Sequence, residues 1–132
     1  MTRDEITVRQ VMRENFTVVD GSIDVMEAMR IMKRVGATSL IVEKRHENDE
    51  YGMVLFSDIA KQVIARDRAP ERVNAFEIMA KPVISVRPGM SIRHCARLFD
   101  RCGISHAPVI EDGKVIGIVS YYLLVLGSLD LD

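Results

Sequence analysis

Apolar residues recur with the spacing of an α-helix in two segments of the chain, residues 25–35 and 92–102. In both segments they fall at positions i, i+3, i+4, i+7 and i+10, which places them along one side of a helix. These residues are Val25, Ala28, Met29, Met32 and Val35 in the first segment, and Ile92, Cys95, Ala96, Phe99 and Cys102 in the second. Each segment is therefore predicted to form a helix that buries one face.

Residues suited to capping stand at both ends of these two helices. Asp24 and Ser91 precede them, and their side-chain oxygens are typical acceptors for the free N–H groups of a first turn. Glu27 follows Asp24 by three positions, as in a capping box. Gly36 and Gly103 follow the helices and are typical C-cap glycines. The helix limits are thus predicted by local residues alone.

Short apolar runs bounded by turn residues predict three strands in each half of the chain. The last two strands of each half should form a hairpin, followed by a further helix. "KRHENDE" predicts a long solvated loop in the first hairpin, whereas Asp112-Gly113 is typical of a tight turn. The strands are Phe16–Val19, Ser39–Glu43, Tyr51–Phe56, Val83–Val86, His106–Ile110 and Val115–Ser120, and the closing helices are Asp58–Ala65 and Tyr121–Gly127.

The order β-α-β-β-α therefore occurs twice, and Met12–Gly36 aligns without a gap on Met79–Gly103. Two short leading segments, Thr7–Met12 and Asn74–Met79, precede the copies and are predicted to be equivalent entry helices. The polar segment Arg66–Val73 links the copies. One copy is too small to bury a good core alone. We expect an α/β (α+β) fold in which repeats 1–67 and 68–132 pack sheet to sheet with pseudo-twofold symmetry, as one compact module.

Composition narrows the class of function. The 132 residues are 48% hydrophobic and 28% charged with a net charge of −1, which is typical of a soluble globular protein and argues against nucleic-acid binding. No apolar stretch has the ~18 residues of a membrane span, and the N-terminus lacks the apolar core of a signal peptide. Cys95 and Cys102 are interpreted as small core residues in a reducing compartment. These features predict a cytoplasmic protein.

Both copies resemble CBS domains, named after cystathionine β-synthase. The second copy supplies "FEIM", "VISVRPGMSI" and "CGISHAPVIEDGKVIGIVS", and the first supplies "VRQVM", "FTVVDGSIDVMEAM", "VGATSLIVE" and "YGMVLFSDI". The resemblance covers residues 7–128 and implies a stand-alone regulatory module. Such modules bind AMP, ADP, ATP or S-adenosylmethionine in clefts between the repeats and signal to a separate target protein. The resemblance also implies a homodimer formed through helix faces.

The family motif "G-I-V-T-x-x-D" pairs a hydroxyl with a carboxylate three residues later, and this chain splits that pair. The first copy has Leu55 and Asp58, whereas the second has Ser120 and Leu123. A carboxylate can accept hydrogen bonds from both hydroxyls of a ribose, and a hydroxyl at a helix start can bind phosphate with the backbone N–H groups. Each copy therefore lacks one member of the pair, and neither site is complete. Losing one charge-assisted hydrogen bond costs about 1.5–3 kcal/mol, which would weaken ligand binding by about tenfold to a hundredfold.

Each candidate also has a purely structural interpretation. Asp58 and Ser120 can simply cap the helices that follow them. His106 stands where relatives place a basic residue for ligand phosphate, but a partly exposed structural histidine explains it as well. Lys81 and Arg87 are further candidates for a phosphate contact, and solvated charges explain them equally.

The family geometry implies that further segments line the clefts. The first is Asn15-Phe16-Thr17 with its counterpart Pro82-Val83-Ile84, whose backbone is suited to pair with an adenine edge. The second is Thr38-Ser39-Leu40 with its counterpart Ser105-His106-Ala107, and the apolar walls are Val83, Ile84 and Pro108. A core position accounts equally well for the apolar members of this group. The candidate ligand-binding residues are thus Asp58, Ser120, His106, Phe16, Thr38, Val83, Ile84, Ala107 and Pro108.

Two functions follow from the sequence. The first is a non-catalytic sensor of an adenosine-type nucleotide. The second is a dimeric interaction scaffold with vestigial pockets, which the split motif favours. The apolar segment "YYLLVLGSL" needs a covering surface in both cases. The sequence offers no catalytic triad, phosphate loop or histidine spacing for a metal, so neither an enzyme nor a metal or cofactor requirement is expected.

Overall fold

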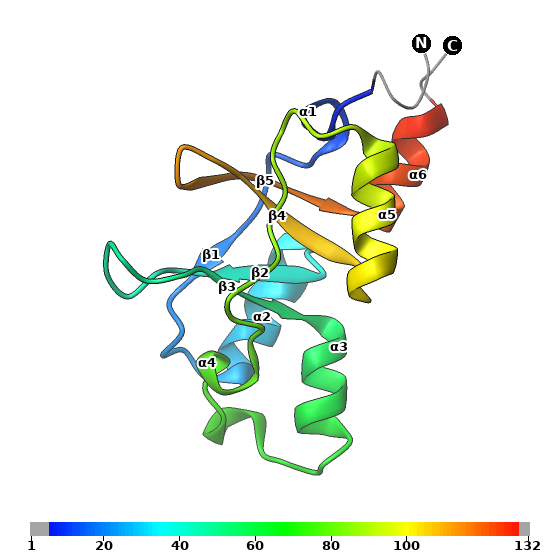
Figure 1. The fold of residues 1–132 in the computed structure, drawn as a ribbon. Helices are drawn as coiled ribbons and strands as arrows, with labels where there is room; N and C mark the ends of the chain where they lie inside the picture. The colour runs from blue at the N-terminus through cyan, green and yellow to red at the C-terminus, as the bar shows by residue number, and fades with distance from the viewer. Residues whose placement is uncertain (1–5, 130–132) are drawn as a thin grey trace. The chain divides into compact units, whose positions relative to one another are not determined.

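The computed structural model describes residues 6–129, which fold into short strands and helices (Figure 1). The α+β class is confirmed. The strands are β1 (Val18–Val19), β2 (Ser39–Val42), β3 (Gly52–Leu55), β4 (His106–Glu111) and β5 (Lys114–Ser120). The helices are α1 (Val8–Val11), α2 (Val25–Val35), α3 (Phe56–Ile59), η1 (Ala60–Ile64, π-helical), η2 (Pro70–Arg72, 3₁₀), α4 (Ala75–Ile78), α5 (Ile92–Cys102) and α6 (Tyr121–Leu129).

The chain forms two compact units that exchange the leading segments of the sequence repeats. One unit is Phe16–Val83, and the other combines the chain up to Asn15 with the chain from Ile84 onward. The leading segment of repeat 1–67 thus packs with repeat 68–132, and the leading segment of repeat 68–132 packs with repeat 1–67. Residues 1–5 and 130–132 of these repeats lie outside the described part of the chain.

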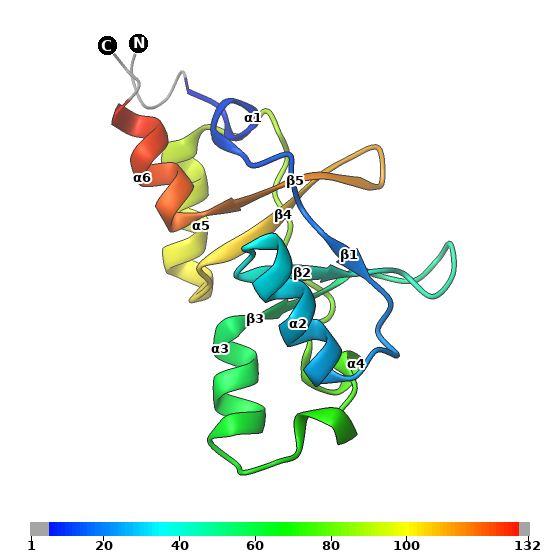
Figure 2. The ribbon, with the colours of Figure 1, turned by 180° about the vertical axis from the view of Figure 1, so that it is seen from behind.

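The unit Phe16–Val83 is built on a three-stranded sheet in the order β1-β2-β3. β1 runs parallel to β2, and β2 pairs with β3 in an antiparallel register that places Ser39 opposite Leu55. α2 packs on this sheet through Val25 and Met32, which are 0% and 1% exposed (Figure 2). Val25, Ala28 and Met32 of the predicted stripe are thus buried, but Val35 at its end is 47% exposed because it lies beyond the contact with the sheet core.

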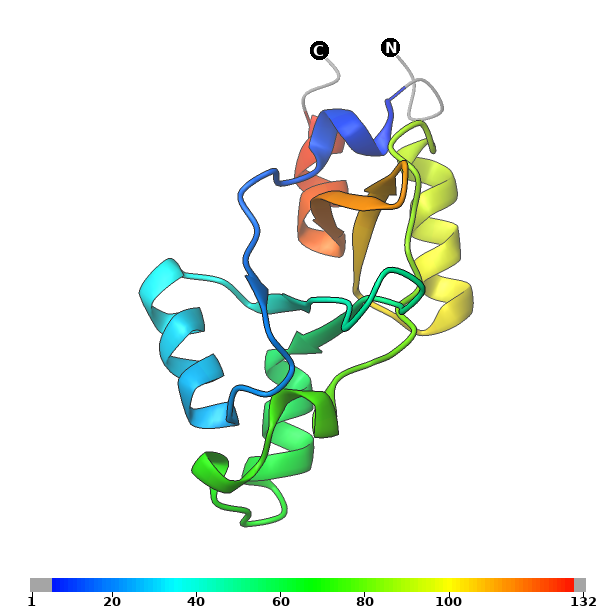
Figure 3. The ribbon, with the colours of Figure 1, turned by 90° about the vertical axis from the view of Figure 1, so that its left-hand side faces the viewer.

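The second unit is built on the hairpin of β4 and β5, with α5 and α6 beside it (Figure 3). Asp112 and Gly113 have φ angles of 53° and 77°, and these two positive angles fit the tight turn that the sequence predicts. The strand predicted at Val83–Val86 is reduced to one bridge, in which Val86 pairs with Val109. The predicted length of this strand was wrong, because among its four residues Val86 is the one that hydrogen-bonds to β4, at the backbone of Pro108 and Ile110.

The predicted helix caps are confirmed. The side chain of Asp24 accepts a hydrogen bond from the N–H of Glu27 at 2.8 Å, and that of Ser91 from the N–H of His94 at 3.2 Å. Gly36 and Gly103 end their helices with φ angles of 69° and 66°, a conformation that side chains beyond Cβ disfavour.

Two glycines let the leading segments lie directly on the hairpins. A Cβ at Gly52 would lie 2.5 Å from the Sδ of Met79, and one at Gly117 would lie 2.7 Å from the Sδ of Met12. Beside these glycines, Met53 and Ile118 form bridges to the residues that directly follow the leading segments, Ala80 and Arg13. The same close approach therefore occurs in both units, and in both it joins a hairpin to the end of the leading segment of the other repeat.

Candidate functional site

The helix after β3 begins two residues earlier than predicted, which changes the role of Asp58. Leu55 is the N-cap and Asp58 is the third helical residue, so Asp58 is not the N-cap that the sequence suggests. Its Oδ2 accepts a hydrogen bond from the N–H of Leu55 at 2.8 Å. This is the carboxylate half of a capping box. Oδ1 is then the oxygen that a ribose hydroxyl can approach.

The helix after β5 keeps the other half of the same box. The Oγ of Ser120, the last residue of β5, accepts a hydrogen bond from the N–H of Leu123 at 3.3 Å. The proton of the hydroxyl can still be donated to a ligand. The family pair T-x-x-D thus has the spacing of a capping box, and each repeat retains one of its two members.

Equivalent hydrogen bonds tie each helix start to the beginning of the neighbouring strand. The N–H of Phe56 donates to the carbonyl of Thr38 at 3.1 Å, and the N–H of Tyr121 donates to the carbonyl of Ser105 at 3.2 Å. Thr38 is therefore held next to the turn of helix that carries Asp58. The structure brings these two candidates together within one unit.

His106 and Ser120 are brought together in the other unit. They are directly opposite in the register of β4 and β5. The Nδ1 of His106 lies 2.8 Å from the Oγ of Ser105, so Nε2 is the ring nitrogen left to meet a ligand. Burial lowers the pKa of His106 below its ordinary value, so the free imidazole is neutral at pH 7.

The remaining candidates divide between exposed and core positions. Phe16 and Val83 are half-buried in the first unit, and Ile84 is 40% exposed in the second. Ala107 and Pro108 are buried, and the carbonyl of Pro108 accepts the N–H of Val86 at 3.0 Å. Ala107 and Pro108 thus have a structural role in the sheet. That the nine candidates line ligand-binding clefts stays a prediction.

Sequence reasoning missed a cluster around Asp49 at the other end of the first sheet. The Nζ of Lys81 lies 2.8 Å from the Oδ2 of Asp49, so Lys81 is paired and is not a solvated charge. This ion pair and hydrogen bonds from Arg45 lower the pKa of Asp49 well below its usual range. The signal in the sequence was the length of the loop that carries Asp49; its partner Lys81 is distant in the chain.

Two other properties of residues 6–129 bear on the site. Three or more His, Cys, Asp or Glu side chains do not come together as a metal-binding group anywhere in this range. None of the helices in it has both the length and the hydrophobicity that a bilayer span requires.

Comparison with known proteins identifies the repeats. A family model for the CBS domain matches residues 8–65 and 75–125. A hexameric CBS-CP12 protein from bloom-forming cyanobacteria is 36% identical with a TM-score of 0.91, over 93% of this chain and 71% of that one. The CBS domain pair of MJ0100, solved with 5′-methylthioadenosine and S-adenosyl-L-methionine, is 24% identical with a TM-score of 0.78, over 91% of this chain and 93% of that one. That likeness shows the fold alone.

Longer proteins contain a similar segment. Homoserine O-acetyltransferase of Methanosalsum zhilinae is 34% identical over 88% of this chain, which spans only 23% of the enzyme. The chain spans 59% and 43% of two other curated relatives, so the activities of these whole proteins do not transfer to it. Since the family model matches once in each repeat and the fold agrees, the chain belongs to the CBS-domain family as a pair of CBS repeats.

Proposed function

We propose that this chain is a cytoplasmic, non-catalytic regulatory module that binds an adenosine-type ligand and signals to a separate protein. The ligand would be AMP, ADP, ATP or S-adenosylmethionine. The observation that carries the proposal is the pairing of His106 with Ser120 across the hairpin, at the start of α6. Both side chains retain hydrogen-bonding capacity toward a ligand at that position.

The chemistry at the start of α6 suits a phosphate or another oxygen acceptor. The hydroxyl of Ser120 and the Nε2 of His106 can both donate, whereas the N–H groups of Tyr121 and Leu123 already donate to Ser105 and Ser120. In the first unit, the Oδ1 of Asp58 suits a ribose diol. The MJ0100 pair, which shares this fold, was solved with two adenosine compounds, and this supports the ligand class by analogy.

A second candidate function is a dimeric scaffold whose pockets no longer bind ligand. The exposed apolar side chains of α6 favour it, because Tyr122, Val125 and Leu129 are 65%, 62% and 70% exposed. Apolar surface of this extent is typical of an interface. A homodimer is proposed under both functions, so dimerisation alone does not separate them.

Thermal unfolding with AMP, ADP, ATP, S-adenosylmethionine and GMP tests the sensor. A ligand that binds only the folded state adds about 2.7 kcal/mol at a hundredfold excess over Kd, and we expect a rise in Tm with an adenosine compound but not with GMP. If the ligand binds at the start of α6, Ser120→Ala and His106→Ala should each reduce the shift in Tm, while Asp58→Ala should not. If the ligand binds at the start of α3, Asp58→Ala should reduce the shift and the other two substitutions should not. Ser128→Ala, further along α6, is the control.

The absence of any shift at millimolar ligand would overturn the sensor. A stable dimer by analytical ultracentrifugation in that case, lost on Val125→Glu, would favour the scaffold. Ligand shifts that none of the three site substitutions changes would leave the ligand class intact and remove the site assignment.

A further inference from the structure

The loop between β2 and β3, residues 43–51, is held in place by one carboxylate. The Oδ2 of Asp49 accepts hydrogen bonds from the N–H of Arg45 at 2.9 Å, from the Nε of Arg45 at 3.1 Å and from the Nζ of Lys81 at 2.8 Å. The side chain of Asp49 is only 8% exposed. The loop is therefore fixed to Lys81, which lies just after the leading segment Asn74–Met79 and belongs to the same unit.

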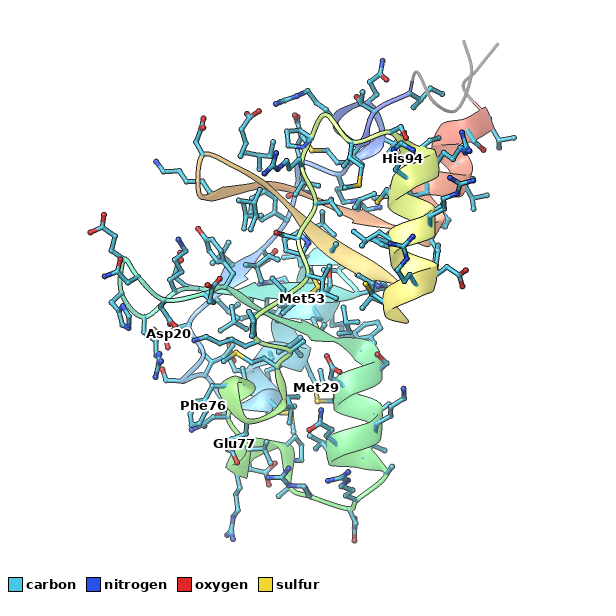
Figure 4. The ribbon with its side chains drawn as sticks, in the orientation of Figure 1. Asp20, Met29, Met53, Phe76, Glu77 and His94 are labelled. Carbon is cyan, nitrogen blue, oxygen red and sulfur yellow. The ribbon has the colours of Figure 1, made fainter. Side chains whose placement is uncertain are left out.

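A pocket of about 490 Å³ lies against this loop, entirely within the unit Phe16–Val83. Its apolar side is formed by Val42, Met79 and Phe76, and Phe76 is 52% exposed although it is aromatic. Asp20 and Phe76 lie on the same side of the unit (Figure 4). The full lining is Asp20, Gly21, Ser22, Val42, Glu43, Arg45, Phe76, Met79 and Lys81.

One part of the pocket wall is cationic. Asp49 neutralises one of the two positive charges of Arg45 and Lys81, so the trio keeps a net positive charge. The ammonium of Lys81 has three N–H donors, and Asp49 takes one of them. Arg45 uses its Nε for Asp49, and its terminal nitrogens can reach a ligand. A carboxylate is the group that this wall is suited to bind.

Another part of the wall is anionic. The Oδ1 of Asp20 accepts the N–H of Ser22 at 2.8 Å, and the Oε1 of Glu43 accepts the N–H of Lys44 at 2.9 Å. Hydrogen bonds from Ser22 lower the pKa of Asp20, so its carboxylate is charged at neutral pH. The second oxygen of each carboxylate suits an ammonium group.

The equivalent place in the other unit is a pocket with a different lining: Arg87, Pro88, Gly89, Met90, Ile110, Glu111 and Asp112. There the turn is Asp112-Gly113, without a counterpart of Arg45 or Asp49. Arg9 takes the place of Phe76, since its N–H donates to the carbonyl of Pro88 as that of Phe76 donates to Gly21. Arg9 pairs with Glu111 at 2.6 Å. Both linings are charged, but an aromatic side chain beside two cations, Phe76 with Arg45 and Lys81, occurs in the pocket of the first unit and not in its counterpart.

We propose that this pocket binds a small zwitterion with an apolar side chain, in the chemical class of an apolar α-amino acid. Its carboxylate contacts Lys81 and Arg45, its ammonium contacts Asp20 and Glu43, and its side chain packs on Phe76 and Met79. A ligand with a single charge would leave one wall unpaired. The pocket lies at the ends of β1 and β2, away from Thr38 and Asp58, so it is distinct from the nucleotide site proposed above.

NMR of the full chain with ¹³C-methyl methionine tests the proposal. The probes are L-leucine, L-methionine and L-phenylalanine, and we expect at least one to shift the methyl resonance of Met79 saturably. Isoamylamine and 4-methylpentanoate each lack one charged group of leucine. Loss of one charge-assisted hydrogen-bonded contact weakens binding by about tenfold or more, so both should bind at least that much more weakly than leucine.

Single substitutions assign the two walls. Glu43→Gln and Arg45→Gln should each weaken binding severalfold, whereas Glu47→Gln, in the same loop but outside the lining, should not. Amide spectra of the variants verify their fold. The proposal is overturned if no probe shifts the methyl resonance of Met79 at concentrations up to about 10 mM, since a Kd above that value is too weak to indicate a specific site. It is also overturned if the analogues bind as well as leucine. Ser120→Ala should leave binding of the zwitterion unchanged. A failure of the zwitterion proposal can therefore be distinguished from a failure of the proposed nucleotide site.

Discussion

Single residues at the two helix starts combine a structural and a proposed ligand-binding role. Asp58 and Ser120 each make the hydrogen bond that their structural interpretation requires, at 2.8 and 3.3 Å. Neither bond uses up the group, because a carboxylate has a second oxygen and a hydroxyl has a proton to donate. The two interpretations are therefore compatible at both residues.

The pKa of His106 provides a test of a phosphate contact. Burial keeps this pKa low in the free protein, and a nearby phosphate would raise it. Binding would then take up a proton, so affinity should rise as the pH falls below the pKa of the complex. Calorimetry with AMP from about pH 8 to pH 5.5 should show wild-type affinity rising relative to that of His106→Gln.

The comparison with His106→Gln removes the titration of AMP itself from the measurement. Adenosine, which has no phosphate, is the ligand control and should show no such rise. A ratio of wild-type to variant affinity that stays constant over this pH range would remove His106 from the phosphate site.

At the scale of elements, the helix starts separate capping from ligand binding. Asp58→Ala removes the acceptor for the N–H of Leu55 and should lower the free energy of unfolding by about 1 kcal/mol. Asp58→Asn keeps a side-chain oxygen at that position and should lose much less. Urea unfolding without ligand measures both, and equal losses would contradict the capping role.

At the scale of the whole molecule, the exchanged leading segments make the ends of the chain depend on one another. Gly127 in α6 packs on Val11 in α1, and a Cβ at Gly127 would overlap with the Cγ1 of Val11. Replacing a glycine inside a helix with alanine normally stabilises the helix by about 1 kcal/mol. Here overpacking costs about 1–3 kcal/mol, so the Tm should fall.

The double variant Val11→Ala/Gly127→Ala tests this contact, because it removes the Cγ atoms that the new methyl group would meet. We expect the double variant to lose less stability than the sum of the two single variants. Strictly additive losses would show that α1 does not dock on α6 in solution.

The sequence by itself predicted what depends on neighbouring residues. The apolar stripes of α2 and α5, their caps at Asp24 and Ser91, and the turn at Asp112-Gly113 follow from spacing and local backbone preference. The last residue of each predicted stripe was wrong: Val35 and Cys102 are exposed, and of the two cysteines only Cys95 is the core residue that the sequence predicts. The CBS repeats were also predictable, because two aligned copies carry more information than either one. The family matches confirm them.

Only the tertiary structure decided the features that join distant parts of the chain. It moved Asp58 from the N-cap to the third helical residue, paired Asp49 with Lys81, and placed each leading segment on the other repeat. These outcomes depend on which surfaces meet when the core forms, and one repeat is too small to form a good core alone. Spacing along the chain fixes the elements, whereas burial between distant segments selects their partners.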